Sequence, residues 1–326
     1  MRAWLPEHQV YGPEPARESD IESLNRIFAD AFTDRYRRDG LVGVRVPHLN
    51  PQVWRYALCD AGEGAMVWRD EAGQIAAFNV AHCSGAEGWM GPLAVRPDRQ
   101  GTGIGKTIVR TAVDWLIAEG VTTVGLETMP RTVENIGFYA RLGFTPAYLT
   151  VTMTNDIGTR GHAVPSLLSQ RPPSPPPGDR ERATAAARRL VTDLVRGPDF
   201  TREILLTAEL GLGDTTLVEG PAGLDALVLW HSAPLAEGRP REELRILKLA
   251  ARDERAFVAA IAAAEATAAR AGVRRVAIRC QTRYELAFRH LIERGYRVRW
   301  TDLRMTFEGY PEPHPVGGVL FSNWEI

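Results

Sequence analysis

The most informative segment of the sequence is Leu93-Ala-Val-Arg-Pro-Asp-Arg-Gln-Gly-Thr-Gly-Ile-Gly105. An apolar strand runs into a glycine-rich turn, which leads directly into an amphipathic helix expected over about 103–119. Glycines at 101, 103 and 105 allow positive φ and let a ligand approach the backbone closely. The first N–H groups of the helix have no intrahelical partners, and the helix dipole adds positive potential there. The stretch therefore predicts an anion site suited to a pyrophosphate.

Two well-known nucleotide motifs do not fit this spacing. A Walker A loop would end as Gly105-Lys106-Thr107 does, but Gln100 stands where its first glycine is required. A dinucleotide fingerprint could begin at Gly101-Thr-Gly103, but Lys106 stands where its third glycine is required. Both readings fail at one position.

A third pattern fits, and a second motif accompanies it. Gln100-Gly-Thr-Gly103-Ile-Gly105 resembles the acetyl-CoA loop of the GNAT acetyltransferase superfamily. Downstream, Asn135-Ile-Gly-Phe138-Tyr139-Ala-Arg-Leu142-Gly143-Phe144 is similar to the same family's Asn and Phe-Tyr element. The resemblance covers about 15–155 well and 200–326 only in layout. Two motifs at the right distance are more specific than either alone.

The resemblance implies acetyl-CoA as a co-substrate and assigns residues to it. Pantetheine would lie between two splayed strands and pair with the backbone of Leu93, Ala94 and Val95. Asn135 would contact the pantetheine arm, and Tyr139 would lie near the sulfur. The pyrophosphate would be wrapped by the loop, namely Gln100, Gly101, Thr102, Gly103, Ile104, Gly105 and Lys106.

The same resemblance implies direct attack of an amine on the thioester, with Tyr139 as the general acid for the departing thiolate. For the general base, Glu127 near a strand end is the first candidate and His82 the second. Each has a structural alternative: Tyr139 could pack in the core with Phe138, either base could be structural, and a water chain could replace them both.

The second half of the chain repeats the layout of the first. Gly120 and Gly272 are 152 positions apart, and so are Gly143 and Gly295. Such self-similarity predicts two copies of one domain. Before the repeat point, strands are expected over 65–69, 74–83, 88–95, 121–128 and 144–154, with a short helix over about 133–142.

The second copy lacks the glycines of the loop. Adding 152 turns Gly101, Gly103 and Gly105 into Asp253, Arg255 and Phe257. An acidic side chain there would repel a pyrophosphate, and a bulky one would block the backbone. The second copy is thus expected to keep the fold without the cofactor site. The final stretch, 319–326, reads as a strand, and the carboxylate of Ile326 is a further candidate for the active site.

These observations predict an α/β (α+β) chain of two GNAT-like domains, each a mixed, mostly antiparallel splayed sheet flanked by helices. The predicted divisions are a catalytic domain over 1–165, a proline-rich linker over 166–180 and a degenerate domain over 181–326.

Composition narrows the function. The chain has 326 residues, with 39 basic and 40 acidic side chains, so it lacks the basic excess of a nucleic-acid binder. No apolar run is long enough for a membrane span, and three scattered cysteines fit reduced thiols in a cytoplasmic protein. Metal-ligand spacing is absent, so no metal is expected. The scarcity of lysine suggests a G+C-rich bacterial genome, and a homodimer is left open.

The function expected from the sequence is an acyltransferase: an acetyl-CoA-dependent N-acetyltransferase acting on the primary amine of a small molecule. Two alternatives stay open at this point. One is acetylation of a protein or peptide amine, and the other is a non-catalytic acyl-CoA sensor.

Overall fold

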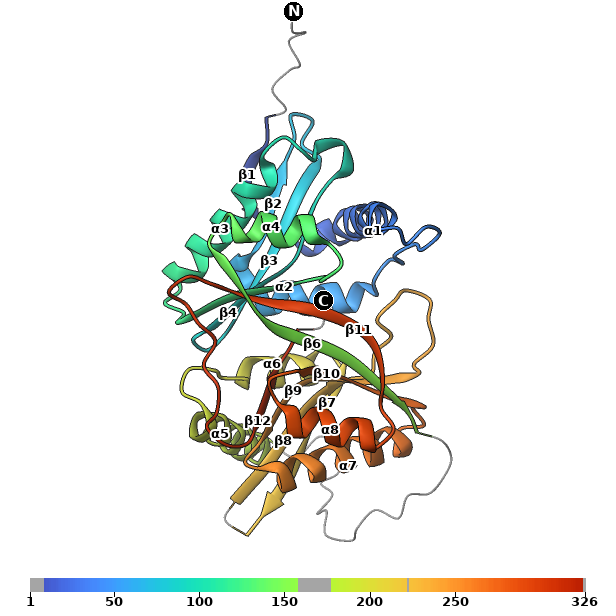
Figure 1. Ribbon diagram of the computed structural model, residues 1–326, viewed down its shortest axis with the longest axis vertical. Helices are drawn as coiled ribbons and strands as arrows, with labels where there is room; N and C mark the ends of the chain where they lie inside the picture. Colours follow the sequence, from blue (N-terminus) through green and yellow to red (C-terminus); the bar gives the residue numbers. More distant parts are fainter. Residues whose placement is uncertain (1–8, 158–176, 222, 325–326) are drawn as a thin grey trace, which may run out of the picture.

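The computed structural model describes residues 9–157, 177–221 and 223–324. Its first half alternates helices and strands in the order expected from the sequence (Figure 1). The helix predicted after the glycine turn spans Ile104–Ala118, and the short helix before Gly143 spans Val133–Ala140. The elements of this half are β1 (Tyr11–Pro15), α1 (Ile21–Arg38), α2 (Pro51–Ala61), β2 (Ala65–Arg69), β3 (Ile75–Ser84), β4 (Glu87–Val95), α3 (Ile104–Ala118), β5 (Thr123–Thr128), α4 (Val133–Ala140) and β6 (Phe144–Asp156).

The second half follows the same order, and the offset of 152 found in the sequence holds in space. Val133 and Glu285 open equivalent helices at that offset, as do Ile104 and Ala256 within two residues of a helix start. The elements are α5 (Pro177–Leu194), α6 (Thr201–Glu209), β7 (Gly213–Gly220), β8 (Gly223–His231), β9 (Glu243–Ala251), α7 (Glu254–Arg270), β10 (Arg275–Gln281), α8 (Glu285–Glu293), β11 (Arg297–Phe307) and β12 (Val319–Ser322).

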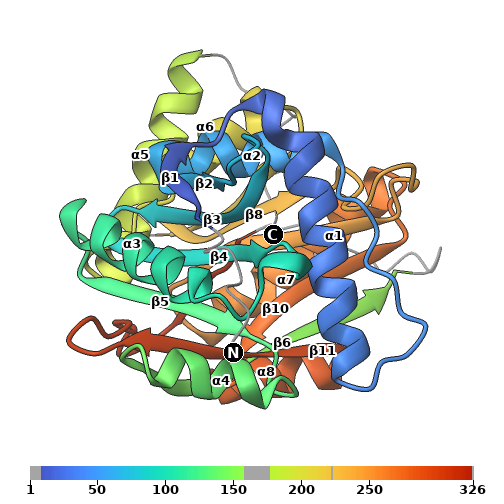
Figure 2. The ribbon, with the colours of Figure 1, turned by 90° about the horizontal axis from the view of Figure 1, so that it is seen from above.

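The two halves exchange strands. In the described residues one sheet of twelve strands runs in the order β1-β2-β3-β4-β5-β11-β6-β10-β9-β8-β7, with β12 paired to β9. β11 of the second half lies between β5 and β6 of the first, and β6 lies between β11 and β10 (Figures 1 and 2). The antiparallel register of β6 and β11 runs from Phe144 opposite Phe307 to Thr154 opposite Arg297. Each half thus completes the sheet of the other.

This exchange bears on the predicted division of the chain. The mixed α/β fold is confirmed, but the sheets of the two copies are continuous rather than separate. Most of the predicted linker, 166–180, lies outside the described residues, and α5 begins at Pro177 within it. The boundaries 1–165 and 181–326 stay predictions about the order of the chain.

Helices cover both faces of the sheet in the first half. α1 and α2 pack on one face, in a core that contains Leu24, Trp54 and Phe78. α3 and α4 pack on the other face, in a core with Val109 and Tyr139. We call these the α1/α2 face and the α3/α4 face. None of the helices in the described part of the chain is both long and apolar enough to cross a membrane.

Candidate active site

The two central parallel strands of the first half, β4 and β5, separate at a bulge. β4 pairs with β5 from Glu87 to Met90, where Met90 lies opposite Leu126. The register of β4 on β3 then slips at Gly91, whose φ is 141°. Beyond the slip, 93–95 pair with β3 but with no other described strand. This leaves a gap between β4 and β5 that opens at Gly91.

Leu93, Ala94 and Val95, the residues predicted to pair with pantetheine, line this gap. Ala94 is buried in the core beneath α1 and α2, whereas Leu93 and Val95 are half-buried on the α3/α4 face. This alternation is that of a strand with both faces covered. The side chains therefore hold the strand in place while one edge of its backbone faces the gap.

The glycine loop at the end of this strand is built as the sequence predicted. Gly101 and Gly103 have φ of 78° and 90°, values that favour glycine. Among the described residues, no atom lies within 4 Å of the place where a Cβ would stand on either glycine. The backbone here is open to an approaching ligand.

The side chains around the loop hydrogen-bond to its backbone and do not cover the side where a ligand would approach. Gln100 donates from Nε2 to the Val95 carbonyl at 3.1 Å, and the Thr102 hydroxyl donates to the Arg99 carbonyl at 2.7 Å. Ile104 is buried and anchors the first turn of α3, while Lys106 is exposed. This arrangement leaves the first amides of α3 and one lysine at the mouth of the gap.

α4 lies beside the start of α3. A Cβ on Gly105 would stand 3.6 Å from the ring of Phe138, so the loop and α4 form adjoining walls. Asn135 is half-buried on α4. Tyr139 is buried with Phe138 and Phe144, at ring-centroid distances of 5.2 and 6.1 Å, and burial raises the pKa of its phenol above the usual value. It therefore stays protonated, as a general acid must before it donates.

Glu127 lies in the region expected, but its surroundings are those of an ion pair. Its carboxylate accepts from the Arg304 guanidinium at 2.8 Å and also contacts Arg279 and the Thr150 hydroxyl. Burial would raise the pKa of Glu127, but the two guanidinium charges outweigh it and lower the pKa to about 2. A carboxylate so stabilised is a poor proton acceptor, so this geometry does not support Glu127 as the general base.

His82, the second candidate, lies between two acceptor groups. Its Nδ1 lies 2.8 Å from the carboxylate of Asp60, and its Nε2 lies 3.2 Å from the carbonyl of Gly91 at the bulge. Both side chains are buried. Burial opposes ionisation of Asp60, but the hydrogen bond from His82 and the charge of Arg202 lower its pKa. A carboxylate only accepts, so Asp60 favours a proton on Nδ1; the Gly91 carbonyl is an acceptor too, so it opposes a lone pair on Nε2.

A second buried polar cluster joins the halves next to this pair. Lys248 on β9 is 1% exposed and donates to the hydroxyls of Ser84 and Ser322 at 3.3 and 3.0 Å. Its ammonium lies 3.6 Å from the carboxylate of Glu203, which also accepts from Ser84. Ser322 in turn donates to Glu87 at 2.6 Å, and burial raises the pKa of that carboxyl group. The cluster ties β3, β4, α6, β9 and the C-terminal segment together.

In the second half, the equivalent gap between strands is filled by the chain itself. β9 pairs with β10 up to Ile246, and its next residues, Lys248–Ala251, pair with β12. By the order of the strands, these residues correspond to the gap-lining end of β4. β12 runs antiparallel to β9 and occupies the slot that pantetheine would need in a working copy.

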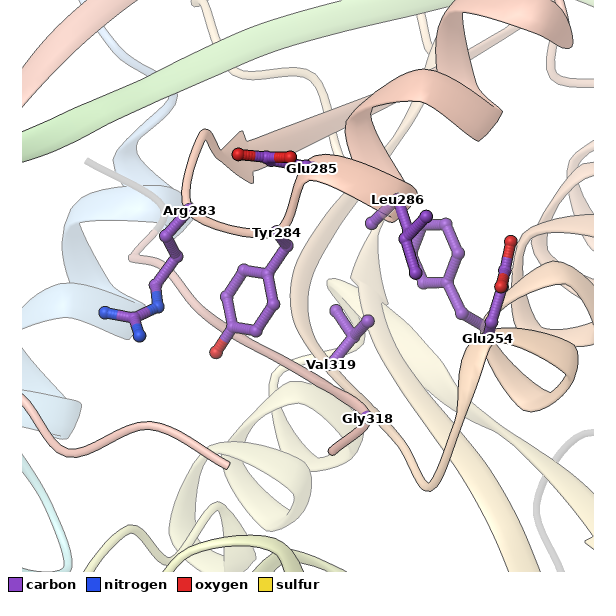
Figure 3. Close-up of a pocket in the computed structure, with 9 residues that line it drawn as sticks. Glu254, Arg283, Tyr284, Glu285, Leu286, Gly318 and Val319 are labelled. Atoms are coloured by element: carbon purple, nitrogen blue, oxygen red, sulfur yellow. The ribbon is translucent and has the colours of Figure 1, made fainter. Parts of the chain in front are cut away.

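The equivalent of the glycine loop has a side-chain cap in place of open backbone. The side chain of Asp253 accepts from the Ala256 amide at 2.8 Å and so caps α7 itself. A cavity of about 300 Å³ lies between the starts of α7 and α8. Phe257 and Val319 line it where the first half has open backbone (Figure 3). Loss of the cofactor site in this copy stays a prediction.

Comparison with known proteins agrees with this geometry. Residues 21–144 match the acetyltransferase (GNAT) family. This part of the chain is a GNAT domain. A search of curated proteins finds no match. GNAT domains use acyl-CoA and an acceptor, and the parted strands and open loop described above lie within the matched residues.

Solved structures resemble the whole chain, beyond the GNAT domain, in fold. A GCN5-related N-acetyltransferase from Sphaerobacter thermophilus has a TM-score of 0.61 at 16% identity, covering 96% of this chain and 99% of that one. A tandem GNAT protein from the clavulanic acid biosynthesis pathway has a TM-score of 0.58 at 13% identity, covering 94% and 100%. The Saccharomyces cerevisiae N-myristoyltransferase with bound myristoyl-CoA has a TM-score of 0.61 at 12% identity, covering 96% and 81%. At these identities the likeness concerns the fold.

The structure brings together most of the residues singled out from the sequence and adds others. The strand, the loop and α4 lie around one gap. Sequence reasoning missed Asp60, Lys248, Arg304 and Trp324, all of which lie at the junction of the halves. Lys248 carried a signal, because it is one of only two lysines and stands among the apolar residues of 246–251. Ile326 and its carboxylate lie outside the described residues.

Proposed function

We propose that this chain is an acetyl-CoA-dependent N-acetyltransferase that acts on the primary amine of a small molecule. The observation that carries the proposal is the contrast between the halves. The GNAT domain has an open loop and, among the described residues, a strand edge after Gly91 that no strand other than β3 pairs with, whereas in the second half β12 pairs with the corresponding edge and Asp253 caps the helix start beside a cavity. One acyl-CoA site per chain is therefore expected, in the first half.

The cofactor residues are proposed as the resemblance implied. The backbone of 93–95 pairs with pantetheine, the loop from Gln100 to Lys106 holds the pyrophosphate, and Asn135 contacts the pantetheine arm. A backbone N–H within 93–95 would then stabilise the oxyanion of the tetrahedral intermediate.

The reaction is a direct transfer. The amine nitrogen attacks the thioester carbonyl carbon, the C–S bond breaks, and the thiolate takes a proton from Tyr139. We assign the proton acceptor to His82, oriented by Asp60, rather than to Glu127. The proton leaving the nitrogen would pass to His82 Nε2 directly or through one water, and the Gly91 carbonyl would then accept the N–H of the imidazolium.

A small acceptor is supported by the contacts that enclose the α1/α2 face near the gap. Tyr36 on α1 packs against Trp300 on β11 at a ring-centroid distance of 5.8 Å. Asp39, just after α1, accepts from the Thr132 hydroxyl at 2.5 Å beside the start of α4. α1 is thus tied to both neighbours of the gap, which leaves less room for an extended peptide than an open groove would.

The test is a thiol-release assay with acetyl-CoA and a panel of small primary amines, using the wild type, Tyr139→Phe and the exposed control Tyr11→Phe. We expect Tyr139→Phe to lower turnover by about a hundredfold, with little change in the dissociation constant of acetyl-CoA. Tyr11→Phe should match the wild type. Equal turnover in Tyr139→Phe would remove the general-acid assignment, and absence of thiol release with every amine would contradict the proposed reaction.

A further inference from the structure

The C-terminal segment carries a tryptophan from the second half to the first. After β12, the Asn323 amide donates to the Leu247 carbonyl at 3.0 Å, and its side chain donates to the Arg279 carbonyl at 3.0 Å. The same side chain accepts from Gln281 Nε2 at 2.7 Å. These three bonds fix the direction of the chain just before Trp324. The tryptophan is therefore placed by the sheet rather than by its own contacts alone.

The indole of Trp324 lies beside the residues that precede the bulge. Its ring centroid is 5.2 Å from that of Trp89 and 6.2 Å from that of His82, onto which it stacks. The ammonium of Lys248 lies 4.2 Å from the ring and adds a cation–π contact. Trp89 is two residues before Gly91, so Trp324 borders the start of the gap between β4 and β5.

Trp89 and Trp324 form one aromatic layer on the α1/α2 face. The indole of Trp89 lies flat over Gly125 on β5, where a Cβ would overlap the ring. The guanidinium of Arg304 lies 3.6 Å from the Trp89 centroid and 5.8 Å from the Trp324 centroid. The layer is thus held from both sides and has little freedom to move away.

The opposite face offers no room at the same point. Met90, Leu126, Tyr139 and Phe144 are buried there in one core. An acyl group that extends from a thioester at the bulge cannot enter this core without displacing packed side chains. On the α1/α2 face it meets the layer made by Trp89 and Trp324.

We propose that Trp324 is the wall that ends the acyl site, so that the chain accepts a short acyl group and rejects a long one. The inference rests on the proposed function, because it requires acyl-CoA to bind in the gap after Gly91. It makes the second half part of the specificity of the first, since Trp324 reaches the site only through β12. Trp324 is a specificity-determining residue and takes no part in proton transfer.

The test measures binding of acetyl-CoA and octanoyl-CoA, without an amine, to the full chain. We expect the wild type to bind acetyl-CoA more tightly. Trp324→Ala should raise the affinity for octanoyl-CoA relative to acetyl-CoA by at least about tenfold, because a wall against methylene groups has been removed. Trp324→Phe keeps a smaller ring and should give a smaller rise in the affinity for octanoyl-CoA relative to acetyl-CoA. This variant replaces Trp324→Ala in the test if the alanine variant does not fold. The control is Leu320→Ala, which loosens the core beneath the tail but leaves the indole.

Each outcome decides between the two proposals. If Trp324→Ala binds acetyl-CoA but the ratio of the two affinities is unchanged, the wall is overturned and the proposed function stands. If Leu320→Ala raises the ratio as much as Trp324→Ala does, the effect belongs to docking of the tail, and the assignment to the indole is overturned. If the wild type binds neither thioester, the acyl-CoA site itself is refuted and the wall with it.

Discussion

Glu127 on β5 and Arg304 on β11 lie directly opposite each other in the antiparallel register, with carboxylate and guanidinium 2.8 Å apart. They are the centre of a run of alternating charges, Asp302–Arg279–Glu127–Arg304–Glu312, that crosses the junction of the halves. The run explains how the exchanged strand β11 is held in one register. A slip by one residue would turn the charges to the apolar face.

Arg304→Met should destabilise the protein strongly. Arg304 is fully buried, and its loss leaves the carboxylates of Glu127 and Glu312 without their shared partner. Removing one member of a buried ion pair costs about 3 kcal/mol or more. Urea denaturation would measure this. The control Arg26→Met, in an exposed pair with Glu22, should change the free energy of unfolding by less than about 0.5 kcal/mol. Similar effects of the two substitutions would contradict the role given to the charge run.

The stability of the protein should depend on Glu127 at acid pH. Its pKa is about 2 in the folded chain and 4.5 in the unfolded chain, so the folded state favours the carboxylate. This contribution is fully present above pH 4.5 and is lost as the pH falls toward 2. We expect Glu127→Gln to be less stable than the wild type at neutral pH and the difference to shrink in acid. Thermal unfolding of both proteins across this range checks it, with the exposed Glu22→Gln as control. A difference that stays constant with pH would rule out the linkage.

Gly103→Ala and Gly120→Ala form a matched pair. Both glycines have positive φ, 90° and 79°, and open space at the Cβ position, so each alanine should cost about 1 kcal/mol of stability from backbone strain alone. Only Gly103 lies in the proposed pyrophosphate loop. We expect Gly103→Ala to weaken binding of CoA and Gly120→Ala to leave it unchanged, as measured by equilibrium titration. Equal affinities in the two variants would show that the loop is only a turn.

Asp60→Asn should lower turnover through His82. An amide in place of the carboxylate can offer an N–H to Nδ1, which would fix the other tautomer and remove the lone pair at Nε2. We expect a fall of about a hundredfold in kcat and a changed pH profile. Arg202→Gln is the control, because it removes the 3.0 Å ion pair of Asp60 with Arg202 and leaves the contact with His82. If both variants lose activity equally, Asp60 acts through the ion pair and the base assignment fails.

The parts of the fold with local signals could be predicted from sequence. The strand, turn and helix from Leu93 to Ala118 follow from glycine positions and helical periodicity, and so does the short helix that carries Tyr139. The repeat at 152 positions also predicted equivalent elements in the second half.

Contacts between distant segments could not be predicted in this way. The alternation of apolar and polar residues over 297–307 does not predict that β11 pairs with β5 rather than with a strand of its own half. Either partner strand would bury the same face of β11. Glu127 was placed on the right strand, yet its two guanidinium partners come from β10 and β11. Asp60 and His82 are 22 residues apart and meet only when α2 packs on β3. The C-terminal stretch 319–326 was predicted to be a strand. Its pairing with β9, however, depends on the gap between strands that it fills.

We propose that one half of this chain holds acyl-CoA and the other does not. The most direct test is the stoichiometry of acetyl-CoA binding to the full chain, measured by calorimetric titration of the wild type and Gly103→Glu. We expect one site per chain in the wild type and none in the variant, where a carboxylate would face the pyrophosphate. Two sites, or one site that survives Gly103→Glu, would contradict it.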